Sequence, residues 1–123
     1  MDKSQITYDE ASDTLTITFE PGASATGIEL NEHIILRIDK KRRKAVGITF
    51  LDYSLLAQKA DFGPRSFPLT GLGKLSENLR MLALDILQKS PVSDILVLST
   101  YTPSYTESIP ITSLHTIPIS MTG

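Results

Sequence analysis

Apolar and polar residues alternate with a period of two through most of the first half of the chain. Leu15, Ile17 and Phe19 are separated by threonines. The same alternation recurs in residues 27–30, 33–38 and 46–50, and residues 6–8 begin in the same way. A period of two is typical of strands that bury one face and expose the other. These segments therefore predict an antiparallel meander of about four short strands.

Turn-forming residues separate the predicted strands. Pro21-Gly22 ends the strand at 14–19, because proline lacks an amide donor and glycine accepts turn geometry. Residues 39–44 form the last turn of the meander. Asn31-Glu32 interrupts the alternation of 27–38 and predicts an irregularity or bulge in that strand.

The one segment with clear helical spacing follows Ser76, a good N-cap residue. Its apolar positions form a single stripe: Leu79, Leu82, Ala83, Ile86 and Leu87. Ser90-Pro91 ends the pattern. We expect this stripe to cover the apolar face of the meander, which cannot remain in water.

The C-terminal region predicts a pair of strands followed by an extended tail. Residues 94–100 are a continuous apolar run, and residues 106–113 can return antiparallel to it. The motif Ile-Pro-Ile occurs twice, at residues 109–111 and 117–119. Because proline in strands is confined to edges, these segments are expected to be edge strands or extended arms. They are apolar enough to prefer a partner, and we hypothesise that the tail packs on another subunit. The assembly residues predicted in this way are Ile109, Ile111, Ile117 and Ile119.

These elements predict one α+β domain over residues 1–123. Residues 1–56 form the meander, residues 57–75 a connecting loop, and residues 76–123 the helix and the C-terminal strands. Gly and Pro residues in the connecting segment disfavour regular structure there.

Composition limits the location and the chemistry of the protein. The chain of 123 residues has no cysteine, which removes disulfides and thiol chemistry and fits a reducing compartment. No export signal is recognisable at residues 1–5, and the apolar runs are too short to span a bilayer. We expect a cytoplasmic protein without a membrane partner.

Charge is concentrated at one place. The chain has 12 basic and 14 acidic residues, yet five basic residues are consecutive: Lys40, Lys41, Arg42, Arg43 and Lys44. A basic loop of this kind can neutralise phosphates of a nucleic acid. It can equally be a solvated hairpin tip, which suits the acidic character of the remaining chain.

Other candidate sites have simple structural explanations. Asp9, Glu10 and Asp13 could offer oxygens to a hard cation, but they lack the spacing of a calcium loop and are ordinary turn residues. His33 has Glu29 and Glu32 nearby in sequence, which fits a histidine-carboxylate metal site or a general base. A strand histidine on the polar face explains it as well, and no third ligand has suitable spacing.

Catalytic and phosphate-binding motifs are equally weak. His115 lies far from His33 in sequence, and Gly71-Leu72-Gly73-Lys74 lacks the spacing of a phosphate loop. Tyr101 and Tyr105 fit a contact surface or the ends of strands. The sequence therefore predicts no catalytic residue, no metal site and no cofactor.

Four segments carry a resemblance to a known family: residues 6–9, 13–17, 33–39 and 46–54. They resemble a small bacterial family catalogued as domain of unknown function twenty-two eighty-three, over roughly the first 55 residues. Their recurring features are a Tyr-Asp before a turn and a Val-Gly-Ile strand. The chain departs from the family at residues 40–45, where the family usually has glycine. The resemblance implies that an antitoxin-like role beside a toxin is conceivable.

Three functional hypotheses follow. The leading one is a non-catalytic interaction or structural module that forms a homo-oligomer. The first alternative is an antitoxin-like or nucleic-acid-binding regulator that uses residues 40–44, with a nucleic acid or a protein as partner. The second alternative is a small-molecule enzyme whose site lies at a subunit interface.

Overall fold

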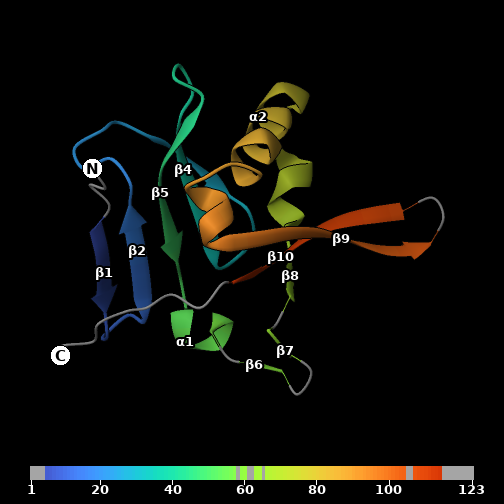
Figure 1. The fold of residues 1–123 in the computed structure, drawn as a ribbon, viewed down its shortest axis with the longest axis horizontal. Coiled ribbons are helices and arrows are strands. Elements are labelled where there is room, and N and C mark those ends of the chain that lie inside the picture. Colours follow the sequence, from blue (N-terminus) through green and yellow to red (C-terminus); the bar gives the residue numbers. More distant parts are fainter. Residues whose placement is uncertain (1–4, 58, 61–62, 65, 105–106, 115–123) are drawn as a thin grey trace.

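The computed structural model describes residues 5–57, 59–60, 63–64, 66–104 and 107–114 (Figure 1). A five-stranded antiparallel sheet, one main helix and a C-terminal three-stranded sheet form an α+β fold. The predicted fold class is therefore confirmed.

The five-stranded sheet contains the first half of the chain. Its strands are β1 (Gln5–Asp9), β2 (Thr14–Thr18), β3 (Thr26–Glu29), β4 (Ile34–Asp39) and β5 (Lys44–Phe50). They lie in the order β1-β2-β5-β4-β3, and every neighbouring pair is antiparallel. Thus β5 is the central strand, and β1 and β3 are the edges.

The predicted alternation is realised as rows of side chains that cross the sheet. Ile48 of β5 is paired with Ile17 of β2 on one side and with Leu36 of β4 on the other. Opposite residues of a sheet share a face. All three are at most 2% exposed, so this row belongs to the core.

The sheet has five strands rather than about four, because residues 31–33 form a turn and not an irregularity within one strand. Oδ1 of Asn31 accepts hydrogen bonds from the backbone N–H groups of His33 at 2.8 Å and Ile34 at 2.9 Å. An asparagine side chain that bonds to the following backbone stabilises a reversal of the chain. The reversal lets β3 and β4 pair as a hairpin.

The strand order departs from a simple meander. β2 pairs with β5 and not with β3, although β3 follows it in sequence. The backbone N–H groups of Phe19 and Glu20 both donate to the carbonyl of Val46, at 2.7 and 3.3 Å. This keeps the chain beside β5 beyond the last residue of β2.

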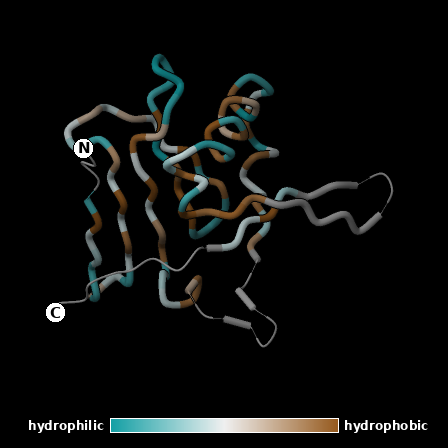
Figure 2. The backbone as a smooth tube through the Cα atoms, in the orientation of Figure 1, coloured by the Kyte–Doolittle hydropathy of each residue, from teal (hydrophilic) through white to brown (hydrophobic). Residues whose placement is uncertain are grey.

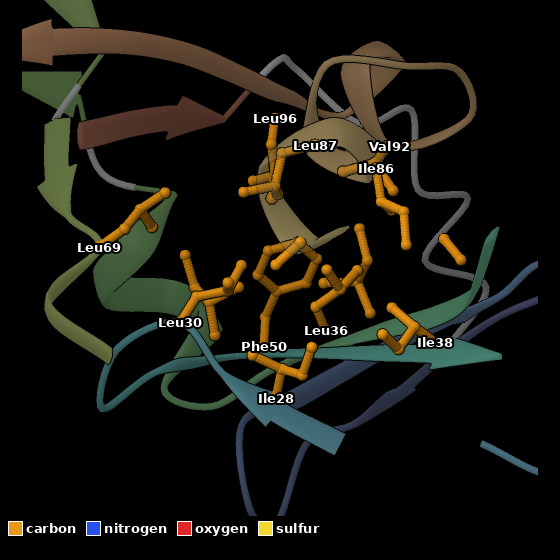
Figure 3. Packing of buried hydrophobic residues seen from close by; sticks show 14 of the residues in the cluster. Ile28, Leu30, Leu36, Ile38, Phe50, Leu69, Ile86, Leu87, Val92 and Leu96 are labelled. Atoms are coloured by element: carbon orange, nitrogen blue, oxygen red, sulfur yellow. The ribbon is translucent and has the colours of Figure 1, made fainter. Parts of the chain in front are cut away.

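Helix α2 (Glu77–Leu87) is the predicted helix. Oγ of Ser76 accepts a hydrogen bond from the backbone N–H of Leu79 at 3.3 Å, so Ser76 is the N-cap. The buried positions of α2 belong to the same cluster as the inner face of the sheet: Leu82, Ala83, Ile86 and Leu87. Figure 3 shows Phe50 and Leu36 of the sheet facing this layer.

The C-terminal strand pair gains a third strand from the preceding region. β9 (Leu96–Ser104) and β10 (Glu107–Leu114) pair as predicted, and β8 (Ser66–Pro68) pairs with the other side of β10. The order is therefore β8-β10-β9, with β10 in the middle.

The expectation that residues 109–111 form an edge is confirmed only in part: β10 is the middle strand, but its ladder with β8 begins at Ile111, so residues 109 and 110 pair with β9 alone. Pro110 is tolerated because it lies just beyond the ladder with β8, where its carbonyl accepts from the N–H of Leu69 at 2.9 Å. N–H and C=O of one residue point to the same side of an antiparallel strand. The missing donor of Pro110 therefore faces the end of β8 and not the ladder with β9.

Short elements complete the fold, several of them within the predicted connecting loop. They are α1 (Tyr53–Leu56), β6 (Lys59–Ala60), β7 (Gly63–Pro64), and the 3-10 helices η1 (Thr70–Lys74) and η2 (Val92–Asp94). Leu69 and Leu72 in this region are buried in the common core. Within the described ranges, no helix is long and apolar enough to cross a bilayer.

Candidate functional site

The two ends of the five-stranded sheet carry different polar groups. The hairpin tip between β4 and β5 projects from one end and is strongly hydrophilic (Figure 2). The turn between β1 and β2 meets α1 at the opposite end (Figure 1). These two ends and the β1 edge are the candidate sites.

The hairpin tip is held by Asp39. Its Oδ1 accepts from the backbone N–H groups of Lys41 at 3.0 Å and Arg42 at 3.2 Å. Arg43 then adopts a left-handed conformation with φ of 54°. A carboxylate that bonds to the following backbone fixes a tight turn without a glycine. This replaces the glycine expected in this turn from the family resemblance.

Two of the five cations are engaged in ion pairs with the body of the sheet. Arg42 pairs with Oδ2 of Asp39 and Oε2 of Glu20, both at 2.6 Å, and Lys44 pairs with Oε1 of Glu20 at 2.6 Å. The hydrogen bond from Lys44, followed by that from Arg42, lowers the pKa of Glu20. The hydrogen bond from Arg42 lowers the pKa of Asp39. Both carboxylates, ionised, thus stabilise the hairpin tip through these ion pairs.

The other three cations are the ones available to a partner. Lys40, Lys41 and Arg43 are exposed, and none of them forms an ion pair with the residues that the structure describes. The basic loop 40–44 therefore separates into a structural pair and an exposed triplet. Its predicted contact with nucleic acid stays a prediction.

At the opposite end, Asp13 connects the β1–β2 turn to the segment after β5. Its Oδ1 accepts from the hydroxyl of Tyr8 at 2.6 Å and from Oγ of Ser54 at 2.9 Å. The backbone N–H of Ser54 donates to both carboxylate oxygens, and the N–H of Tyr53 donates to the carbonyl of Asp13 at 2.9 Å. Asp13 is left-handed, with φ of 55°. This strained conformation directs the backbone carbonyl and the carboxylate of Asp13 toward the same segment, Tyr53-Ser54.

These contacts shift the pKa values of the pair in opposite directions. The hydrogen bond to Asp13 raises the pKa of Tyr8, and the hydrogen bond from Tyr8 lowers the pKa of Asp13. The cause is the same in both cases, because the bond favours a protonated phenol beside an ionised carboxylate.

Aromatic packing supports this end of the sheet. The rings of Tyr8 and Tyr53 lie edge to face with centroids 6.1 Å apart, and Tyr53 also packs against Phe50 at 6.2 Å. Sequence reasoning missed this connection. Its only signal lay in the family resemblance, because three of the segments that carry the resemblance, 6–9, 13–17 and 46–54, meet here.

Asp9 and Asp13, two of the carboxylates considered for a cation, accept hydrogen bonds from different neighbours. Asp9 accepts from the N–H of Ala11 at 3.1 Å and from Oγ of Ser12 at 2.9 Å, whereas Asp13 serves Tyr8 and Ser54. Among the described residues, no group of three or more His, Asp or Glu side chains could hold a metal ion.

His33 approaches Asp52, not the glutamates considered from the sequence. Nδ1 of His33 lies 3.1 Å from Oδ2 of Asp52, within ion-pair range, but the two atoms lack hydrogen-bond alignment. The contact is therefore an ion pair only when the imidazole is protonated. Asp52 is left-handed, with φ of 54°. This pair would be the chemical basis of the enzyme hypothesis. His115 lies outside the described residues.

A shallow pocket of about 270 Å³ lies between the β3–β4 turn and η1. Glu29 of β3 and Glu32 of the β3–β4 turn line it on one side, and Lys74 lines it from η1. Gly71 forms part of its wall and donates its N–H to the carbonyl of Leu30 at 2.8 Å. A Cβ at this position would overlap with the carbonyl oxygen of Glu29. The glycine therefore serves close backbone packing of η1 on β3, not a phosphate loop.

The β1 edge is the third candidate. β1 pairs with β2 over all five of its residues, and the described residues provide no strand on its other side. Figure 1 shows β1 at the margin of the sheet, away from α2. Ile6 shares the core face with Ile17, its partner on β2, yet it is 45% exposed.

The predicted assembly residues are only partly covered by the structure. Ile111 is half-buried in β10, with β8 and β9 as its neighbours. Ile109 lies in the same strand opposite Tyr101. Ile117 and Ile119 lie outside the described residues, and the role of the four isoleucines in assembly stays a prediction. Tyr105, considered for a contact surface, also lies outside the described residues.

Comparison with known proteins identifies one region of the chain. No curated protein and no solved structure matches the chain significantly. A family model matches from the start of β1 to Ser54, which confirms the resemblance of the first half. The matched region contains the whole five-stranded sheet and the contacts of Asp13 with Tyr53 and Ser54. Residues 5–54 of this chain are thus a match to the family described as protein of unknown function (DUF2283).

Proposed function

We propose that the protein is a non-catalytic interaction module that self-associates through the β1 edge of its five-stranded sheet. The observation that carries the proposal is that β1 lacks the features that normally prevent one sheet edge from pairing with another. The β3 edge at its end, and both edges of the three-stranded sheet, have such features.

The opposite edge of the same sheet is covered at one end, directly after β3. The N–H of Gly71 in η1 donates to the carbonyl of Leu30 directly after β3, and Nδ2 of Asn31 donates to the carbonyl of Pro68 at 3.2 Å. η1 therefore occupies the end of the β3 edge, where an added strand would bind.

The edges of the three-stranded sheet are interrupted. β8 ends in Pro68, β9 contains Pro103, and the ladder between β9 and β10 shifts register between Glu107 and Ile109. Proline removes a donor, and a register shift bends the strand, so both disfavour pairing with a further strand.

β1 has none of these protections. Its sequence, Gln-Ile-Thr-Tyr-Asp, contains no proline and no lysine, and its register with β2 is unbroken. The exposed side chain of Ile6 adds apolar surface that a partner strand would cover. A regular strand with an exposed isoleucine favours addition of another strand.

Light scattering after size-exclusion chromatography tests the proposal. We expect the intact protein to be a dimer or larger and Ile6→Lys to be a monomer, because a charge on this face opposes strand addition. Met81→Lys is the matched control, since Met81 is a 62% exposed apolar residue on α2. A monomeric intact protein, or an Ile6→Lys variant that stays associated, contradicts the proposal.

A second candidate function is favoured by the exposed triplet at the hairpin tip. Lys40, Lys41 and Arg43 would contact the phosphates of a nucleic acid or an acidic surface of a toxin-like protein partner. The ion pairs of Arg42 and Lys44 support this candidate because they hold the tip in one conformation.

Binding of mixed-sequence DNA and RNA at several salt concentrations tests the nucleic-acid contact. We expect the affinity to fall steeply with salt, and the combined variant Lys40→Gln, Lys41→Gln, Arg43→Asn to lose the binding. Asparagine is chosen at position 43 because it tolerates the left-handed backbone. Arg42→Gln should retain most of the salt dependence. Absence of binding at low ionic strength contradicts this candidate.

A further inference from the structure

We propose that two copies of the chain pair β1 against β1 in antiparallel orientation, with Thr7 of one copy opposite Thr7 of the other at a two-fold axis (the axis at Thr7). This pairing joins the two five-stranded sheets into one. This inference rests on the self-association proposed above and adds its geometry. The alternation of faces, the length of the strand and its single charge together select this register.

The alternation of faces restricts where the axis can lie. Ile6 and Tyr8 are paired with Ile17 and Leu15, so they share the core face, whereas Thr7 is paired with Thr16 on the opposite face. A two-fold axis perpendicular to the sheet turns the same face of both copies to the same side. Opposite residues in a regular ladder must share a face. The axis must therefore lie midway between the two copies of one residue, so that this residue faces itself. It cannot lie where a residue faces the copy of its neighbour in sequence.

Strand length selects Thr7 among the possible residues. An axis at Thr7 pairs all five residues of β1 with five residues of the second copy: Gln5 with Asp9, Ile6 with Tyr8, and Thr7 with itself. An axis at Ile6 or Tyr8 pairs only three residues within the strand bounds. The longer ladder satisfies more backbone donors and acceptors.

Charge and apolar surface favour the same register. Asp9 is the only charged residue of β1, and an axis at Thr7 places it opposite the neutral Gln5. An axis at Asp9 would place two carboxylates opposite each other, which is destabilising. With the axis at Thr7, the exposed Ile6 of each copy lies beside the half-buried Tyr8 of the other. The register thus covers the isoleucine that the single copy leaves exposed.

Cross-linking of single-cysteine variants tests the register, and the chain suits it because it has no cysteine of its own. The variants are Thr7→Cys, Gln5→Cys and Asp9→Cys, treated with a short bis-maleimide. Residues on the axis lie about 5 Å apart between copies. Two copies of residue 5, or of residue 9, are separated by about 14 Å, because each residue of a strand advances about 3.4 Å.

We expect Thr7→Cys to form a covalent dimer by itself. Gln5→Cys and Asp9→Cys should form little covalent dimer alone, but a mixture of the two should form the mixed dimer at least several-fold more efficiently. Circular dichroism of each variant checks that the fold is retained, since Asp9 also holds its turn.

The outcomes separate this inference from the function on which it rests. A dimer whose self-cross-linking position is Gln5 or Asp9 overturns the register and leaves self-association intact. A protein that remains a dimer with Ile6→Lys and gives no cross-link at Thr7→Cys overturns the use of β1. A monomer at all concentrations overturns both proposals.

Discussion

The hydroxyl of Tyr8 donates a 2.6 Å hydrogen bond to Oδ1 of Asp13 and thereby ties the edge strand β1 to the turn that follows it. The same carboxylate accepts from Ser54, 41 positions further along the chain. Two residues of the first hairpin thus fix the segment after the central strand β5. The family match ends at Ser54, one of the residues that this connection joins.

Removing the Tyr8 hydroxyl should destabilise the fold. In Tyr8→Phe, Asp13 keeps its bonds with Ser54 but loses its closest donor. We expect a lower Tm at pH 7 with no change in the circular dichroism spectrum. Thermal unfolding measures the effect, with Thr7→Val as the control on the other face of the strand. An unchanged Tm for Tyr8→Phe would show that the bond contributes nothing to the folded state.

The pH dependence of that destabilisation follows from the two pKa shifts. The folded pKa of Asp13 is lowered, so its contribution is present above the unfolded pKa, near 4, and is lost as pH falls through the folded value. The folded pKa of Tyr8 is raised, so its contribution is present below about pH 10 and is lost as pH rises through the folded value. The difference in stability between the intact protein and Tyr8→Phe should therefore be largest at intermediate pH.

Denaturant unfolding at pH values from 3 to 11 checks this prediction. The difference should shrink at both extremes. A difference that is constant across this range would mean that the Tyr8 hydroxyl does not stabilise the fold through its bond to the ionised carboxylate of Asp13.

Gly71 should tolerate no side chain. In Gly71→Ala the Cβ would overlap with the carbonyl oxygen of Glu29, which is backbone and cannot turn away. We expect the free energy of unfolding to fall by roughly 1–3 kcal/mol, as for overpacked sites. Gly73→Ala is the control in the same 3-10 helix, since nothing lies within 4 Å of a Cβ there. It should change stability by less than about 0.5 kcal/mol. Equal effects of the two variants would contradict close packing of η1 on β3.

The tail residues Ile117 and Ile119 give a separate prediction about assembly. If the second Ile-Pro-Ile segment packs on another subunit, the variant Ile117→Ser, Ile119→Ser should dissociate the oligomer, because apolar contact area is lost. Light scattering compares it with Ile6→Lys. Dissociation by Ile6→Lys alone would assign assembly to the β1 edge, and dissociation by the tail variant alone would assign it to the tail.

The chain by itself determined the elements and their buried faces. Alternation of Leu15 and Ile17 with threonines defines a strand and its core face, and the stripe ending at Leu87 defines the helix and its buried side. These are local periodicities, so they can be recognised without knowledge of neighbours. Ser76 was recognised as a cap for the same reason, since its partner lies three residues away.

Tertiary structure decided which elements became neighbours. No local pattern reveals that β2 pairs with β5 or that β8 joins β10 beside β9. Pairing depends on contacts between residues distant in sequence, and many pairings satisfy the same alternation.

The same distinction applies to the candidate sites. The five cations at 40–44 are visible in the sequence, but only the fold shows that Glu20 and Asp39 engage two of them. Likewise, Asp13 looks like an ordinary turn residue until Ser54 is placed beside it. Charge and turn propensity are local properties, whereas the partner of a side chain depends on which distant segment the fold brings within hydrogen-bonding distance.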